Sequence, residues 1–160
     1  MALQIYTAGG YREPAGGAGG WAYLFVDDRQ GQVGSDAGVL VTDTPAGGEY
    51  LAIIKALRAA RDAGYREVAV YCDCTGVVNQ LAGRAGVSSL RILPHYRRAT
   101  ELLADFDAAT VAYASRDHPH IQAADALGYP VDLHLTLANA PEFEQSASAL
   151  RSSADIHIAA

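Results

Sequence analysis

The sequence has little cysteine and no long apolar run. Its 160 residues include two cysteines, Cys72 and Cys74, which are too close together for an ordinary disulfide. We therefore expect a reducing environment and a cytoplasmic location. No apolar stretch is long enough to span a bilayer, and the first residues lack the basic and hydrophobic regions of a signal peptide. We therefore expect no membrane partner.

Basic residues are also scarce, and charged residues of both signs make up a small share of the chain. Charged residues make up 19% of the chain, and the formal net charge is −6. A protein that relies on broad phosphate contacts is usually basic, so this charge argues against strong duplex binding by the whole domain. It does not exclude a nuclease, because a carboxylate metal site itself adds negative charge. Half of the residues are hydrophobic, which argues against extended disorder. The length of 160 residues is enough for one domain with a hydrophobic core.

The hydrophobic periodicity predicts an α/β domain with the element order β-β-β-α-β-α-α-β-α. We expect a five-stranded mixed sheet, an antiparallel meander plus parallel strands, flanked by helices. The glycine-rich residues 9–20 are predicted to be a turn, and residues 67–73, the strongest strand, are predicted to be central. The expected strands are 3–7, 21–26, 33–41, 67–73 and 110–114, and the expected helices begin at Thr44-Pro45, Thr75, Ile92 and Pro119.

We expect this domain to cover residues 1–129. Residues 130–160 are then a C-terminal extension. Towards its end the residues are small and polar and show little hydrophobic periodicity, so we expect the extension to be mobile.

Three acidic residues lie where predicted elements begin or end. Asp73 ends the strongest strand, Glu49 lies in the first turns of the long helix, and Asp125 lies on the last helix. Open α/β sheets place their ligand sites at the carboxyl ends of strands. Carboxylates brought together from distant parts of a chain repel one another unless cations lie between them, and magnesium prefers such oxygen ligands. The pattern therefore predicts a metal-dependent phosphodiester enzyme.

Each acid also has a purely structural interpretation. Asp73 could cap the helix that begins near Thr75. Glu49 could supply favourable charge at a helix N-terminus, and Asp125 could be an exposed helical acid. The three acids together favour the functional interpretation more than any one of them alone.

Five segments around these acids follow one order and spacing, and together they resemble the ribonuclease H family of type I over roughly residues 3–128. No single motif is specific, whereas the combination on the expected elements is. The segments are Tyr6-Thr7-Ala8-Gly9-Gly10, Gly19-Gly20-Trp21-Ala22, Gly48-Glu49-Tyr50-Leu51-Ala52, Tyr71-Cys72-Asp73-Cys74 with Val77-Val78, and Ala123-Ala124-Asp125-Ala126-Leu127-Gly128.

The resemblance implies an endonuclease that hydrolyses the RNA strand of an RNA–DNA hybrid. Glu49, Asp73 and Asp125 would be its catalytic acids and metal ligands. They would hold two Mg²⁺ ions about 4 Å apart, with Mn²⁺ as a substitute, one ion activating water and the other stabilising the leaving 3′ oxygen. His118 would assist catalysis at product release, with His120 as the second choice. The expected partner is the hybrid, with double-stranded RNA as another candidate, and we expect a monomer.

The first catalytic aspartate of the family falls at Ala8. Because that aspartate normally binds both ions, this chain should bind metal poorly and cleave little or nothing. Ala8 is either an inactivating substitution, introduced to trap substrate, or the mark of a naturally degenerate module that binds nucleic acid or protein without catalysis. We favour the inactivated variant, because the residues around Ala8 still suit a working site.

Substrate contacts are expected from glycines and one arginine. The family often has asparagines that read ribose hydroxyls before its helical glutamate, where this chain has Pro45-Ala46-Gly47-Gly48. Backbone groups of Gly47 and Gly48, together with Gly9 and Gly10, could take over that contact. Arg116 could meet a phosphate or be an ordinary surface arginine. The two cysteines are interpreted as core residues, because hard Mg²⁺ does not choose sulfur.

Overall fold

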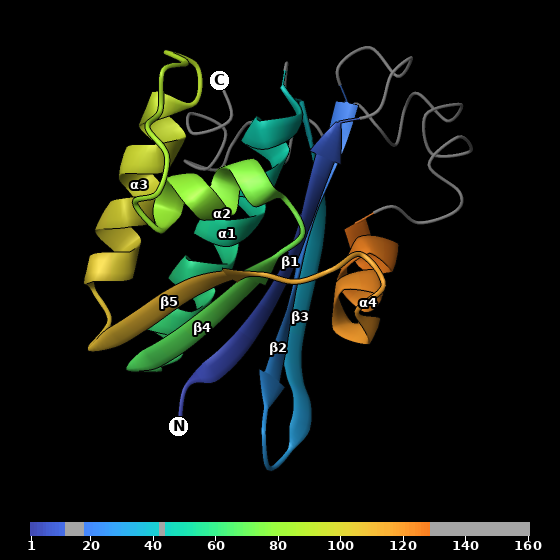
Figure 1. The fold of residues 1–160 in the computed structure, drawn as a ribbon. Coiled ribbons are helices and arrows are strands. Elements are labelled where there is room, and N and C mark those ends of the chain that lie inside the picture. Colours follow the sequence, from blue (N-terminus) through green and yellow to red (C-terminus); the bar gives the residue numbers. More distant parts are fainter. Residues whose placement is uncertain (12–17, 42–43, 129–160) are drawn as a thin grey trace.

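The computed structural model describes residues 1–11, 18–41 and 44–128 (Figure 1). The element order confirms the predicted β-β-β-α-β-α-α-β-α pattern. The expected extension, residues 130–160, lies outside the described residues. The elements are β1 (Leu3–Tyr11), β2 (Ala18–Asp27), β3 (Gly31–Val41), α1 (Pro45–Asp62), β4 (Glu67–Cys72), α2 (Thr75–Leu81), α3 (Leu93–Ala104), β5 (Ala108–Tyr113) and α4 (Pro119–Gly128).

The five strands form one mixed sheet in the order β3-β2-β1-β4-β5. The pairs β1–β2 and β2–β3 are antiparallel, whereas β1–β4 and β4–β5 are parallel. The mixed sheet is as predicted, but the prediction that residues 67–73 are the central strand is wrong. The centre is β1, which pairs antiparallel with β2 and parallel with β4, while helix α1 connects β3 to β4.

The prediction failed because the hydrophobicity of β4 reflects the burial of one face of the strand and not a central position in the sheet. Val68, Val70 and Cys72 are buried beneath the helices, while Ala69 and Tyr71 between them are only half-buried. On that second face, α4 packs on β1, β2 and β3. A strand next to the centre of the sheet can therefore be as apolar on its covered face as a central one.

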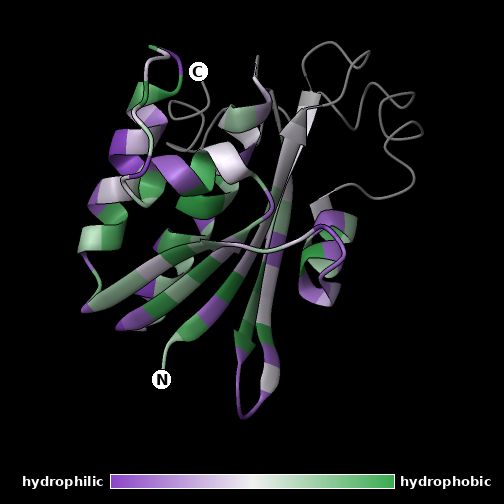
Figure 2. Cartoon of the chain, in the orientation of Figure 1, coloured by the Kyte–Doolittle hydropathy of each residue, from purple (hydrophilic) through white to green (hydrophobic). Residues whose placement is uncertain are grey.

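Helices cover both faces of the sheet, with α1, α2 and α3 on one face and α4 on the other (Figure 1). Side chains alternate between two cores, as the period of two in a strand requires. Ile5 of β1 belongs to the larger core beneath α1, and Tyr6 to the smaller core beneath α4. Figure 2 shows hydrophobic and hydrophilic residues following one another along the strands, and hydrophilic ones in the hairpin between β2 and β3.

Helix α1 begins as the sequence predicts. Pro45 is its first residue, and the Thr44 hydroxyl accepts a hydrogen bond from the Gly47 N–H at 3.1 Å. This cap satisfies one of the backbone donors that a helix start leaves without a partner. At the other end, Gly64 takes a φ of +88°, a conformation that favours glycine. The start of α1, and with it Glu49, is therefore fixed by local sequence.

The glycine-rich segment forms less of a turn than predicted, because Gly9 and Gly10 continue β1, and Gly19 and Gly20 belong to β2. Their lack of side chains lets helix ends touch the sheet backbone. A Cβ at Gly9 would lie 2.2 Å from the carbonyl oxygen of Gly48 in α1. A Cβ at Gly20 would lie 2.4 Å from the carbonyl oxygen at the end of α4. The glycines therefore set the distance between the sheet and both helices.

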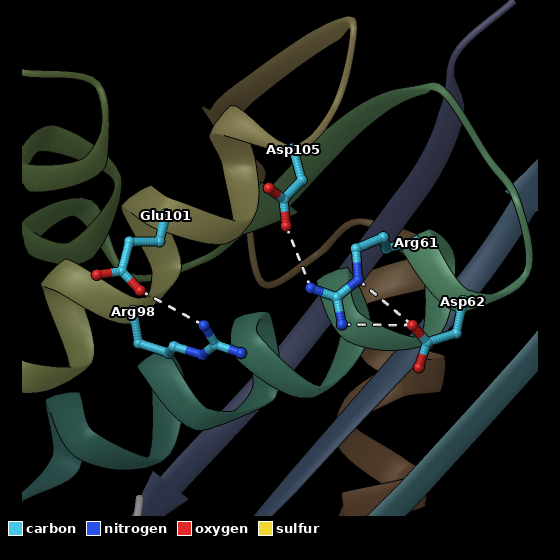
Figure 3. A network of polar contacts seen from close by, with 5 residues as sticks. All are labelled: Arg61, Asp62, Arg98, Glu101 and Asp105. Carbon is cyan, nitrogen blue, oxygen red and sulfur yellow. Dashed lines mark hydrogen bonds and ion pairs between the residues drawn. The ribbon is translucent and has the colours of Figure 1, made fainter.

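Exposed ion pairs lie on and next to helices α1 and α3 (Figure 3). Arg61 of α1 contacts Asp105 beyond α3 at 3.1 Å, and it also contacts its neighbour Asp62 at 3.3 Å. Arg98 contacts Glu101 within α3 at 3.4 Å. Exposed pairs of this kind contribute about 0–1 kcal/mol each. The packing of α1 against α3 therefore depends mainly on its apolar contacts. None of the described helices is long and apolar enough to cross a membrane.

The glycine contact makes a testable prediction for stability. Gly9→Ala places a methyl group into the backbone of α1, so the free energy of unfolding should fall by about 1–3 kcal/mol. Gly76→Ala in α2 is the matched control, since nothing lies within 4 Å of its added Cβ. It should be neutral or stabilising by up to about 1 kcal/mol. Urea unfolding of both variants measures this, and equal stability of the two would contradict the proposed packing.

Candidate active site

The start of α1, the end of β4, β1 and α4 surround a pocket of about 390 Å³. The three acids singled out in the sequence and Ala8 all line it, although they are spread over more than a hundred residues of chain. The structure therefore brings together the side chains that the sequence pattern predicted to meet. The full lining is Ala8, Gly9, Gly10, Pro45, Glu49, Asp73, Arg116, Ile121, Gln122 and Asp125.

Glu49 lies at the buried end of the pocket. The first turn of α1 holds no acidic residue, so Glu49 does not serve as a charge at the helix start. Its carboxylate accepts hydrogen bonds from the Cys72 thiol at 3.6 Å and from the Gly9 backbone N–H. Burial, and then the nearby charge of Asp73, raise the pKa of Glu49 to about 8. A cation bound nearby would favour the ionised form of this carboxylate at neutral pH.

Asp73 follows directly after β4, and its side chain is only 15% exposed. Its Oδ2 accepts a hydrogen bond from Nε of Arg116 at 3.1 Å. The helix-capping interpretation is not supported, because the N-cap residue of α2 is Cys74 and no side chain there makes a capping hydrogen bond. The position of Asp73 is therefore not explained by the start of α2.

The donor set fits a divalent cation. One oxygen of Glu49, one oxygen of Asp73 and the sulfur of Cys72 lie within 4.8 Å of one another. Two ligands of one Mg²⁺ ion, each about 2.1 Å from it, lie at most about 4.2 Å apart, so a small movement would let both carboxylates share an ion. Hard cations choose the oxygens over the sulfur. Glu49 and Asp73 are therefore the residues that could hold a magnesium ion.

Cys72 is a core residue, as predicted, but the sequence did not reveal its contact with Glu49. Its side chain is fully buried beneath α1, and burial, followed by the charge of Glu49, raises the thiol pKa well above its usual value. It is therefore a neutral donor to Glu49. The signal available in the sequence was the alternation of β4, in which Cys72 shares a face with Val70 while Asp73 does not.

Ala8 and Asp125 border the pocket from the α4 side. Ala8 is 4% exposed, and its methyl group belongs to the small core with Ile121 and Ala124. Asp125 follows Ile121 by about one turn of α4 and is exposed at the pocket. Position 8 is thus a buried place between the acids, where a carboxylate would face the same space as theirs.

The predicted substrate residues divide into two groups. Gly9, Gly10 and Arg116 line the pocket. Gly47 does not line it, and its N–H already donates to the Thr44 cap. Gly48 is likewise absent from the lining, since it packs on the backbone of β1. Gly47 and Gly48 therefore contribute to the capping and packing of α1 and do not line the pocket.

Neither candidate histidine lines the pocket. Nδ1 of His118 accepts a hydrogen bond from the His120 N–H at 3.1 Å, next to Pro119 at the start of α4. The ring of His118 stacks on Tyr6 with centroids 4.9 Å apart, and Tyr6 also stacks on Tyr71. The local capping role that the sequence left open for His118 is therefore the one seen.

Comparisons with known proteins agree with this architecture. A family model described as reverse transcriptase-like matches residues 7–128. RNase H1 from the halophilic archaeon Halobacterium salinarum NRC-1 superposes with a TM-score of 0.74 and 27% identity, covering 80% of this chain and 95% of that one. No curated protein matches the chain.

Two further structures share the fold at lower identity. The N-terminal RNase H domain of Rv2228c from Mycobacterium tuberculosis has a TM-score of 0.71 and 21% identity, covering 93% of this chain and 99% of that one. LC11-RNase H1, solved in complex with an RNA/DNA hybrid, has a TM-score of 0.71 and 21% identity, covering 79% of this chain and 93% of that one.

The raised pKa of Glu49 predicts a pH-dependent stability. Between the ordinary value of 4.5 and about 8, the folded state keeps a proton that the unfolded chain has lost. The contribution of this proton is therefore complete below pH 4.5 and is lost as pH rises to about 8. At about 1.4 kcal/mol per pKa unit, the loss is on the order of 5 kcal/mol.

Glu49→Gln removes this titration, so the variant should gain stability relative to the native chain as pH rises through that window. Urea unfolding of both proteins at several pH values without divalent metal measures the difference. Parallel stability curves for the two proteins would show that Glu49 is not a buried, proton-binding group.

Proposed function

The chain belongs to the ribonuclease H family, and on this premise we propose that it is a metal-dependent endonuclease for the RNA strand of RNA–DNA hybrids, inactivated at Ala8. The observation that carries the proposal is the meeting of Glu49, Asp73 and Asp125 with Ala8 in one pocket. A carboxylate at position 8 would complete a set of four acids. Such a set suits magnesium shared with substrate phosphate.

The choice of substrate rests on the fold and its relatives. LC11-RNase H1 is a protein of this fold whose structure contains an RNA/DNA hybrid, and the halobacterial relative is an RNase H1. Both lines of support favour a hybrid over other nucleic acids for this chain. We further propose that residues 1–129 contain the whole nucleolytic unit and that residues 130–160 are an extension to it.

We assign the metal-holding role to Glu49 and Asp73, with Asp125 at the exposed side of the same space. Two divalent ions bound there would activate a water molecule and stabilise the charge on the leaving 3′ oxygen. The Gly9 N–H and the Cys72 thiol orient the Glu49 carboxylate through their hydrogen bonds. This support would keep the Glu49 carboxylate in one position when a cation binds.

The open side of the pocket suits a phosphate backbone. Gly9 and Gly10 contribute only backbone groups to its lining. Arg116 lines the same side and offers a guanidinium, a group that matches phosphate geometry. These residues would bind and orient the strand next to the acids.

One observation favours a second candidate function. Ala8 removes a ligand from the set, and a chain with natural alanine in this place would bind nucleic acid or protein without cleaving it. Double-stranded RNA remains a third candidate, as a different substrate for the same chemistry. Restoring the carboxylate separates these candidates.

The test compares the native chain with Ala8→Asp on labelled RNA–DNA hybrid, RNA duplex and DNA duplex, in Mg²⁺ and in Mn²⁺. Ala8→Asp should cleave the hybrid at least about a hundredfold faster than the native chain, since a metal ligand contributes several kcal/mol to the transition state. Ala8→Asn is the matched control, because it has the size of aspartate without its charge. Adding Glu49→Gln to Ala8→Asp should abolish the gain.

A folded Ala8→Asp protein that cleaves nothing in either metal would refute the nuclease assignment. Tight hybrid binding by that inactive protein would favour the non-catalytic module instead. Cleavage of the RNA duplex in preference to the hybrid would favour the third candidate.

A further inference from the structure

Arg116 contacts one of the acids of the pocket directly. It lies between β5 and α4, and its Nε donates to Asp73 Oδ2 at 3.1 Å. The arginine side chain is 86% exposed, whereas that of Asp73 is 15% exposed. Among the described residues that line the pocket, Arg116 is the only basic one. Its guanidinium thus supplies positive charge to a carboxylate that would also ligate a metal.

Arg116 and a metal ion would compete for the negative charge of the Asp73 carboxylate. A carboxylate oxygen that accepts the guanidinium cannot also bind a cation at full strength, because two positive charges a few ångströms apart repel each other. Ala8 changes the balance between them. It removes one carboxylate from the metal site, which weakens cation binding, while the contact between Arg116 and Asp73 does not involve position 8.

The contact is suited to being broken. A single N–H joins the two side chains, and the arginine is otherwise in solvent. Ion pairs with an exposed partner are worth little, so a bound cation can displace the guanidinium at small cost. Once displaced, the side chain still lines the pocket mouth, where a phosphate would lie under the proposed function.

We propose that Arg116 is a resident counter-ion that competes with divalent metal for Asp73 and moves to the substrate phosphate when metal binds. The identity of the metal and the phosphate rests on the proposed function. Arg116 is then a switching contact between the empty and the loaded pocket. In this chain, with alanine at position 8, the pocket stays mainly in the arginine-bound state.

This role has a signature that a merely structural arginine would not have. Arg116→Gln should strengthen Mn²⁺ binding, because a competitor is lost. It should also weaken binding of an RNA–DNA hybrid, because a phosphate contact is lost. A residue that only kept the pocket in shape would weaken both when replaced.

The experiment measures Mn²⁺ affinity by the electron paramagnetic resonance signal of free Mn²⁺, for the native chain and Arg116→Gln, each also in the Ala8→Asp background. Hybrid affinity of the two proteins that carry Ala8 is measured in parallel by fluorescence anisotropy at saturating Mn²⁺, the condition in which Arg116 would contact phosphate. We expect Arg116→Gln to bind Mn²⁺ about 3–10 times more tightly and the hybrid about 3 times more weakly. Arg66→Gln is the matched control, since Arg66 pairs with Asp107 at 2.7 Å outside the pocket. It should change neither affinity.

Asp73→Asn tests the route of the effect. In that background Arg116→Gln should no longer strengthen Mn²⁺ binding. Equal or weaker Mn²⁺ binding by Arg116→Gln, an effect that persists with Asp73→Asn, an unchanged hybrid affinity, or absence of Mn²⁺ binding in both backgrounds would overturn the proposal. Neither affinity depends on hydrolysis, so the inference stands if Mn²⁺ and hybrid behave as expected while Ala8→Asp fails to cleave, and in that case only the proposed activity fails.

Discussion

The site depends on the contact between the backbone of β1 and the first turns of α1. Gly9 and Gly48 meet so closely that neither has room for a side chain, since added Cβ atoms would lie 2.2 Å and 2.8 Å from the opposing backbone. This contact brings Glu49 within reach of the Gly9 N–H and of Asp73 at the end of β4. A helix held further from the sheet would leave these acids too far apart to share a cation.

Bringing carboxylates together creates an electrostatic problem that the chain meets in two ways. Glu49 has its pKa raised to about 8, mainly by burial, and so keeps its proton near neutral pH. Asp73 pairs with the exposed guanidinium of Arg116. Both arrangements lower the negative charge of the pocket without metal. Both would have to be reversed when a divalent cation binds, which couples metal affinity to pH and to the position of Arg116.

The features of the fold that depend on local chemistry could be predicted from the sequence. The Thr44-Pro45 start of α1 and the order of elements were readable from capping and periodicity, and the order of the acids then located the pocket. The central position of β1 was not readable, because it depends on which strands pair rather than on how apolar each is. The contacts of Cys72 with Glu49 and of Arg116 with Asp73 were also missed, since each joins residues more than twenty positions apart.

The central claim is that Glu49, Asp73, Asp125 and position 8 surround one divalent-cation site. The most direct measurement is anomalous diffraction from crystals of the Ala8→Asp protein grown with Mn²⁺, which locates manganese without reference to activity. The account predicts manganese between these four side chains, with Arg116 no longer in contact with Asp73. Manganese bound only elsewhere on the surface, with the pocket empty at saturating Mn²⁺, would contradict it.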